Sequence, residues 1–73
     1  MSTCNEIREL DVVALTVDVP EKQLVRGQVG TVVMEHAPDA VEVEFIDDQG
    51  ATYALLTLRK SQLLRLRYHV EAA

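Results

Sequence analysis

A segment in the middle of the chain alternates strictly between apolar and charged residues, and no other feature constrains the fold as strongly. Val41, Val43 and Phe45 occupy one set of alternate positions. Glu42 and Glu44 occupy the positions between them. A period of two is typical of a β-strand with one buried and one solvated face. We therefore predict a strand here, with the valines and the phenylalanine buried and both glutamates in solvent.

Four other segments also have the residue types of short β-strands, and turn-forming residues separate all five. A long arm of residues 18–28, anchored by Leu24 and Val25, joins the first strand to the second. Proline within this arm removes a ladder donor and so ends the first strand. A short 3₁₀ turn of residues 59–62 precedes the last strand. The predicted strands are residues 11–16, 29–35, 40–46, 51–58 and 64–70.

This order of elements predicts an all-β fold, a small SH3-like five-stranded barrel. Closure of the sheet, in full or in part, hides the strand edges that would otherwise pair with other chains. The alternative is an OB fold, but that fold usually has a helix where this chain has only a short turn between the third and fourth strands. At 73 residues the chain has room for one domain. We place it at residues 7–70, between a flexible N-terminal tail (1–6) and a C-terminal tail (71–73).

Two local features bear on how the strands pack. The segment from Tyr53 to Leu58 is apolar at nearly every position, so we expect it to be buried on both faces or covered by a second molecule. Gly27 and Gly30 bracket the start of the second strand, which suits a positive φ or a close backbone approach. Gly50 is expected to adopt the left-handed conformation in the turn before the fourth strand.

No group of residues has the sequence arrangement of a catalytic or metal site. Cys4 is far along the chain from His36 and His69, and the three lack the close spacing of zinc ligands. Glu42 and Glu44 share one strand face and could flank a glycosidic bond, but an exposed convex strand offers no substrate pocket. We therefore expect a protein that is not an enzyme and that needs no cofactor or metal.

The N-terminal residues do not have the pattern of a targeting signal. Glu6, Glu9 and Asp11 stand where a signal peptide has lysines and an apolar block. The longest uncharged apolar-rich stretch, residues 51–58, is far shorter than the ~18 residues of a membrane-spanning helix. The single cysteine cannot form an internal disulfide, as is usual in a reducing compartment. These features predict a cytoplasmic protein with no membrane association.

The charged residues are segregated along the chain, which has a net charge of −5. Residues 35–48 hold six acidic residues and no lysine or arginine, whereas residues 59–69 hold four basic residues and no acidic one. One explanation is that the two segments neutralise each other within the fold. The other is that residues 35–48, which we call the acidic hairpin, attract a basic partner. The negative net charge disfavours general binding of nucleic acid.

Several segments, taken together, resemble a known family of bacterial proteins. They are residues 9–16, 18–21, 26–33, 41–45, 57–58 and 62–63. The family is numbered four-nine-two-six among the domains of unknown function, and the resemblance covers roughly residues 7–66. It implies a compact β-barrel with no assigned activity. Members are sometimes encoded beside another small protein, which suggests a two-gene module such as a toxin and its antitoxin.

From these observations we expect a non-enzymatic protein-binding module, the antitoxin-like or regulatory partner of a neighbouring gene product. The acidic hairpin would provide recognition charges and a tyrosine would act as an aromatic anchor. A homodimer is also compatible with the apolar fourth strand. The predicted partner-binding residues are Glu42, Glu44, Asp47, Asp48 and Tyr53.

Nucleic-acid binding is the alternative function. The segment 26–33 also resembles the KOW-type loop of translation and transcription factors, but Arg26 is the only charged residue in it. A local basic strip can bind phosphates even when the net charge of the chain is negative, and such binding weakens steeply with salt. The residues of this strip are Arg26, Arg59, Lys60, Arg65 and Arg67.

Overall fold

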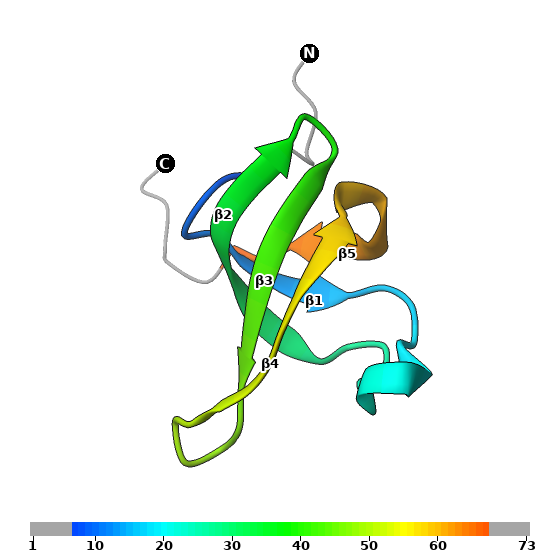
Figure 1. The fold of residues 1–73 in the computed structure, drawn as a ribbon, viewed down its shortest axis with the longest axis vertical. Helices are drawn as coiled ribbons and strands as arrows, with labels where there is room; N and C mark the ends of the chain where they lie inside the picture. Colours follow the sequence, from blue (N-terminus) through cyan, green and yellow to red (C-terminus); the bar gives the residue numbers. More distant parts are fainter. Residues whose placement is uncertain (1–6, 68–73) are drawn as a thin grey trace.

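The computed structural model describes residues 7–67, which form one five-stranded antiparallel sheet (Figure 1). This confirms the predicted all-β fold. Two 3₁₀ helices, η1 and η2, interrupt the connections between strands. The elements are β1 (Val12–Leu15), η1 (Pro20–Lys22), β2 (Val29–Ala37), β3 (Ala40–Ile46), β4 (Thr52–Arg59), η2 (Lys60–Gln62) and β5 (Leu63–Arg65).

The predicted strand limits agree with the structure to within one or two residues, except at the last strand. β3 has the limits that its alternation indicates. β2 runs two residues further than predicted, because Ala37 pairs with Ala40 and leaves a loop of only Pro38 and Asp39. β5 begins at Leu63 and ends at residue 65, so it is much shorter than the predicted strand 64–70.

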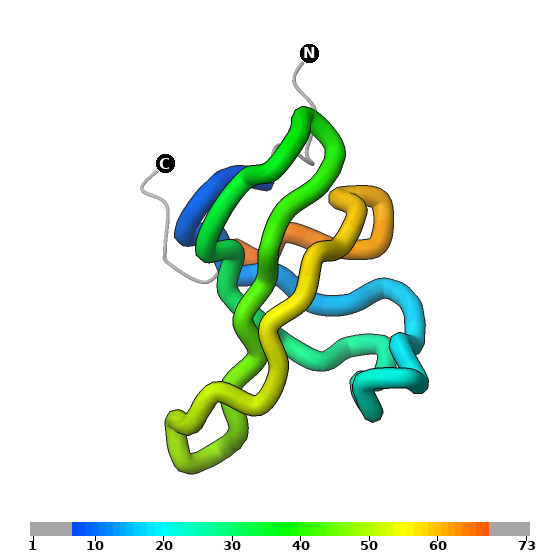
Figure 2. The backbone as a smooth tube through the Cα atoms, viewed as in Figure 1, coloured from blue at the N-terminus to red at the C-terminus, as the bar shows by residue number. Residues whose placement is uncertain are grey.

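The sheet is open, so the predicted closed barrel is not confirmed. The strand order is β4-β3-β2-β1-β5, which places β4 and β5 at opposite edges. The physical reason is η2, which turns the chain away from β4 before β5 begins, and β5 then pairs with β1. The sheet is nevertheless strongly folded into two halves. β1 and β5 form one half, and they lie across β3 and β4, which form the other (Figures 1 and 2). The core fills the space between these two halves.

Strand β2 belongs to both halves of the sheet, and Gly30 lies where it changes partner. Residues 29–31 pair with β1, and β2 pairs with β3 from Thr31 onward, so Thr31 pairs with both strands. A Cβ atom on Gly30 would lie 2.8 Å from Cγ1 of Val43. It would also lie 2.9 Å from the carbonyl oxygen of Glu44 and from Cδ1 of Phe45. The absence of a side chain therefore lets β2 approach β3 closely at the bend.

We expect Gly30→Ala to lower the free energy of unfolding by about 1–3 kcal/mol, and Gly30→Val to lower it further, because added atoms overpack a dense core. Strand propensity alone predicts the reverse order, since valine favours strands and glycine does not. Urea unfolding followed by circular dichroism measures both variants. A Gly30→Val protein as stable as the wild type would contradict the close approach.

The core lies on one face of the sheet, and β3 provides its centre. Val41, Val43 and Phe45 are fully buried, as the alternation predicts. No polar or charged side chain among residues 7–67 is buried with them. Hydrophobic burial of this kind is the main stabilising term for a small domain. The other members of the core cluster are Ile7, Val13, Leu15, Val19, Leu24, Val32, Leu58 and Leu63.

Strand β4 alternates in the structure, although its sequence does not. Leu58 is buried, and Ala54 and Leu56 pack partly buried against the core. Tyr53, before Ala54, and Leu55, between Ala54 and Leu56, are exposed. The prediction of a strand buried on both faces is therefore wrong for β4 in a single chain, and this strand presents apolar side chains to solvent.

The arm between β1 and β2 is held to the core by two side chains, those of Val19 and Leu24. Leu24 is fully buried, whereas Val25, the other predicted anchor, is exposed. Val19 and Leu24 form an isolated antiparallel bridge that closes the η1 turn. Gln23 ends η1 in the left-handed conformation, with φ of 59°. Gly27 also has a positive φ, as predicted for the start of β2.

Some predictions fall on residues 1–6 and 68–73, which lie outside the described residues. They concern the two predicted tails, the end of the predicted fifth strand, Cys4 and His69.

Candidate binding surface

The outer face of β2, β3 and β4 combines acidic and apolar side chains. Glu42 and Glu44 lie on β3, on the side opposite the buried valines. Met34 of β2 is paired with Glu42, and Leu55 of β4 is paired with Glu44. Met34 and Leu55 are 48% and 52% exposed. We call these four residues the acidic-apolar face. The strand register brings them together from three strands.

The two glutamates are not free solvent charges, because neighbouring strands hold them. The carboxylate Oε1 of Glu42 lies 2.8 Å from Nε2 of His36 on β2. The hydroxyl of Thr52 on β4 donates a hydrogen bond of 2.6 Å to Oε2 of Glu44. Both glutamates are half-buried, so the prediction that they lie fully in solvent is only partly correct. Their cross-strand partners fix where the negative charge is presented.

Of the two aspartates in the β3–β4 turn, one shapes the turn and the other is exposed at its tip. The Oδ1 atom of Asp47 accepts hydrogen bonds from the backbone N–H groups of Gln49 and Ala51, at 2.9 and 3.0 Å. Gly50 follows with a φ of 87°, the left-handed conformation expected there. Asp47 is therefore a turn-forming residue, and Asp48 is the aspartate available for an external charge.

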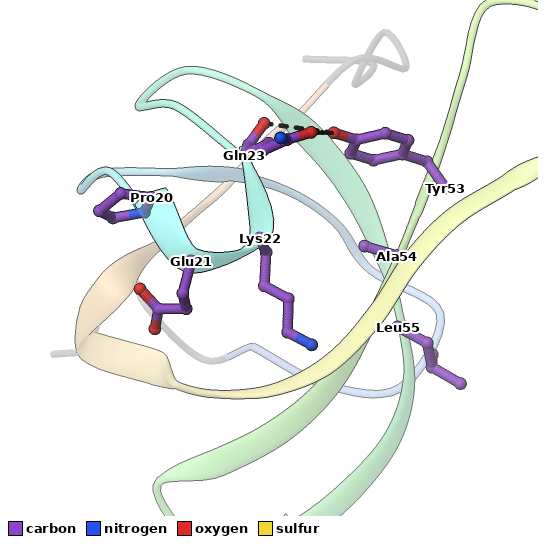
Figure 3. A pocket seen from close by; sticks show the side chains of 7 residues that line it. All are labelled: Pro20, Glu21, Lys22, Gln23, Tyr53, Ala54 and Leu55. Atoms are coloured by element: carbon purple, nitrogen blue, oxygen red, sulfur yellow. Dashed lines mark hydrogen bonds between the residues drawn. The ribbon is translucent and has the colours of Figure 1, made fainter.

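Tyr53 points away from the acidic-apolar face because a β-bulge precedes Ala54. Ile46 pairs with Thr52 and Phe45 pairs with Ala54, which leaves Tyr53 as the extra residue. A bulge re-aims the side chain that it displaces. The hydroxyl of Tyr53 lies 3.4 Å from both the carbonyl oxygen and Oε1 of Gln23, at the end of η1 (Figure 3). These are long, weak hydrogen bonds.

A cleft of about 370 Å³ separates η1 from the start of β4 (Figure 3). Tyr53 closes one end of the cleft through its contact with Gln23. Glu21 and Lys22 provide both signs of charge on the η1 side. The residues that line the cleft are Pro20, Glu21, Lys22, Gln23, Tyr53, Ala54 and Leu55.

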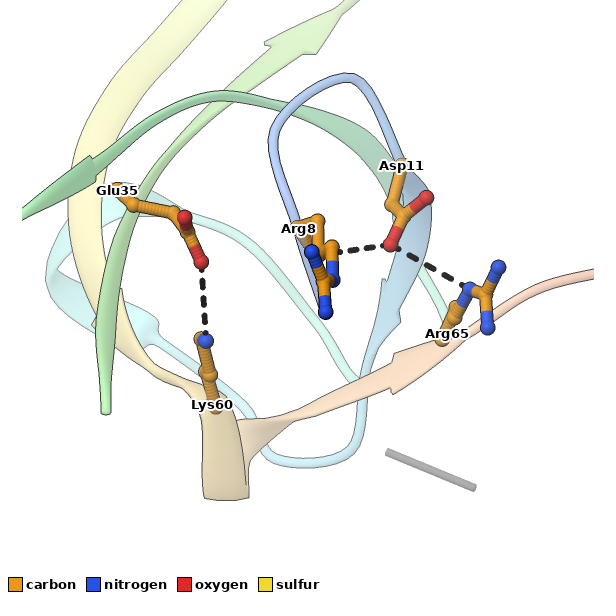
Figure 4. Close-up of polar contacts among 5 residues, drawn as sticks. All are labelled: Arg8, Asp11, Glu35, Lys60 and Arg65. Atoms are coloured by element: carbon orange, nitrogen blue, oxygen red, sulfur yellow. Dashed lines mark hydrogen bonds and ion pairs between the residues drawn. The ribbon is translucent and has the colours of Figure 1, made fainter. Parts of the chain in front are cut away.

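Two of the five residues of the basic strip form ion pairs within the chain (Figure 4). Nζ of Lys60 lies 3.1 Å from Oε2 of Glu35. Nε of Arg65 lies 3.3 Å from Oδ2 of Asp11, which also accepts a hydrogen bond from the backbone N–H of Arg8 at 2.8 Å. The Lys60–Glu35 pair joins the acidic and basic segments of the sequence, so part of their charge is balanced inside the fold.

The other three basic residues are exposed on separate elements. Arg26 lies in the arm, Arg59 ends β4, and Arg67 follows β5. The structure therefore distributes the predicted basic strip over several elements.

Met34 and Leu55 were not predicted as site residues. The strand register places them beside Glu42 and Glu44, and no local sequence pattern encodes that register.

Within residues 7–67, no three histidine, cysteine, aspartate or glutamate side chains gather where they could hold a metal ion. His36 lies on the exposed surface of β2 and contacts Glu42, outside the cleft. In the same part of the chain, no helix has the length and apolar character needed to cross a membrane.

Residues 9–65 match the family described as Domain of unknown function (DUF4926). The chain belongs to this family. The match covers every strand of the sheet and the arm with η1. No curated protein and no solved structure matches the chain.

Proposed function

We propose that this DUF4926 protein is a small, non-enzymatic binding module whose acidic-apolar face contacts a basic protein. The observation that carries the proposal is the placement of Met34 and Leu55 beside the two half-buried glutamates. An interface of this kind combines apolar contact area with charges that select a partner of opposite sign. The partner would carry lysine or arginine around an apolar ridge. The product of a neighbouring gene, as in an antitoxin-like pair, is the first candidate partner.

The strand arrangement supports an SH3-like scaffold for this module. β2 is shared by two halves of the sheet, and η2 separates β4 from β5. The arm between β1 and β2 is the longest connection among residues 7–67. We propose an SH3-like barrel that remains open between β4 and β5, with the binding face on the outside of β2, β3 and β4.

Affinity capture with a matched pair of double variants tests the proposed face. Met34→Ala with Leu55→Ala removes the two apolar side chains beside the glutamates. Val29→Ala with Leu64→Ala is the control, because Val29 and Leu64 are 48% and 51% exposed but pair with Ala14 in the other half of the sheet. We expect the control to retain the neighbouring gene product from the native operon at low salt. We expect the face variant to lose it.

Equal retention by both double variants would contradict the proposed face, and no retention by the wild type would contradict protein binding. Gel shifts with duplex DNA and structured RNA at low salt test the other function class. A shift that weakens steeply with salt, and that disappears in Arg26→Ala with Arg67→Ala, would replace the proposal with nucleic-acid binding. Neither residue has an ion-pair partner within residues 7–67.

A further inference from the structure

Strand β4 has one edge with no strand beside it, because it is the first strand in the sheet order. The backbone N–H of Lys60 donates to the carbonyl of Asp39 at 2.8 Å, so this pair is hydrogen-bonded. Hydrogen-bonded and non-bonded pairs alternate along an antiparallel ladder. In the β3–β4 register, the backbone groups of Leu55 and Thr57 therefore point away from β3, toward the free edge.

The backbone of Arg59 confirms this alternation. Its N–H is the next group on the free edge, and it donates to Oε1 of Gln62 at 2.9 Å instead of to β3. The turn of η2 thus satisfies the last free donor of β4. The backbone groups of Leu55 and Thr57 have no such partner among residues 7–67, and the cleft separates η1 from this part of β4.

From Ala54 to Leu58 this edge lacks the features that usually prevent strands from pairing with other chains. Residues 49–58 contain no charged residue and no proline. Natural edge strands are usually protected by lysine, proline, a bulge or a covering element. Here the only such feature is the bulge at Tyr53, near the start of the strand. The remaining edge offers hydrogen-bonding groups beside the exposed side chains of Leu55 and Thr57.

The charges at the two ends of β4 make the edge complementary to itself. Asp48 is exposed in the turn before the strand, and Arg59 is exposed at its end. An antiparallel copy of β4 would place Arg59 of each chain opposite the start of β4 in the other, on the side of the turn that carries Asp48. Opposite charges at both ends favour this orientation, and a parallel arrangement would bring like charges together. A two-fold axis makes both contacts identical.

We infer that β4 pairs antiparallel with β4 of a second copy of this chain, so that two sheets join into one. The two-fold axis passes near Leu56. In this register the backbone groups of Leu55 in each copy form hydrogen bonds with those of Thr57 in the other. Pairing stops at the Tyr53 bulge, next to the cleft, so the interface is short and the dimer dissociates on dilution. The acidic-apolar faces of the two copies lie on the same side of the joined sheet.

Sedimentation equilibrium of the full chain at increasing concentration tests the dimer. We expect the mass to rise from 8.2 kDa toward twice that value. Thr57→Lys places a charge on the free edge and is expected to raise the dissociation constant about tenfold or more. Thr16→Lys is the control, because Thr16 is also exposed but lies just after β1. A wild type that stays at one chain mass throughout would overturn the inference.

A charge exchange identifies the interface even if one variant alone is less stable. Arg59→Glu and Asp48→Arg each create two repulsive contacts in their own dimer, so each is expected to be monomeric. Mixing the two restores an opposite-charge pair at both ends, and we expect a mixed dimer with wild-type affinity. No association in the mixture would overturn the proposed orientation. Neither substitution touches Met34 or Leu55, so this result is independent of the proposed protein-binding face.

Discussion

Phe45→Ala is expected to lower the free energy of unfolding by about 3–5 kcal/mol, the largest effect of any single substitution considered for this protein. Phe45 is fully buried at the centre of the core, and its ring lies close to Gly30 at the bend of β2. Removal of the ring leaves a cavity where the two halves of the sheet meet. Domains of this size are stabilised by only about 5–15 kcal/mol, so a large part of the total would be lost.

Ile46→Ala is the matched control for this substitution. Ile46 is the next residue of β3 and is exposed, so its truncation is expected to change the stability by about 0.5 kcal/mol or less. Urea unfolding monitored by circular dichroism compares the two variants. If Ile46→Ala were the more destabilising, the two faces of β3 would be assigned in reverse.

Leu24→Ala is expected to have the second largest effect, a loss of about 2–5 kcal/mol. Leu24 is the fully buried side chain of the arm, and its backbone N–H donates to the carbonyl of Val19 at 3.1 Å. Its loss leaves a cavity beneath the arm. The position of Gln23 and its contact with Tyr53 depend on the same anchor.

Val25→Ala tests whether the arm is oriented as described. Val25 follows Leu24 directly but is exposed, so we expect its truncation to be nearly neutral. Equal losses of stability in Val25→Ala and Leu24→Ala, measured by thermal unfolding of both variants, would show that the arm is anchored differently.

The strands could be predicted where the sequence repeats with a period of two. The alternation in β3 gave both its limits and its buried face, because one-sided burial leaves a direct trace in the sequence. The sequence of β4 lacks this alternation. Its apolar residues lie on both faces, and only Ala54, Leu56 and Leu58 face the core. Tyr53 and Leu55 are therefore exposed apolar residues that no alternation in the sequence separates from the buried ones.

The failures of prediction concern properties that depend on pairing between distant strands. The last strand was predicted as residues 64–70, but β5 starts at Leu63 directly after η2 and ends at residue 65, and Leu64 is exposed. Closure of the barrel, the bulge that displaces Tyr53 and the pairing of Met34 with Glu42 are likewise set by strand register. A single sequence carries no local signal for register beyond the choice of buried face.

An amide spectrum of the nitrogen-labelled chain, titrated with the purified neighbouring gene product, tests the proposed binding face most directly. We expect the largest shifts at Met34, Glu42, Glu44 and Leu55, with little change at Val29 and Leu64. Shifts centred on Val29 and Leu64, or no shifts at all, would contradict the account.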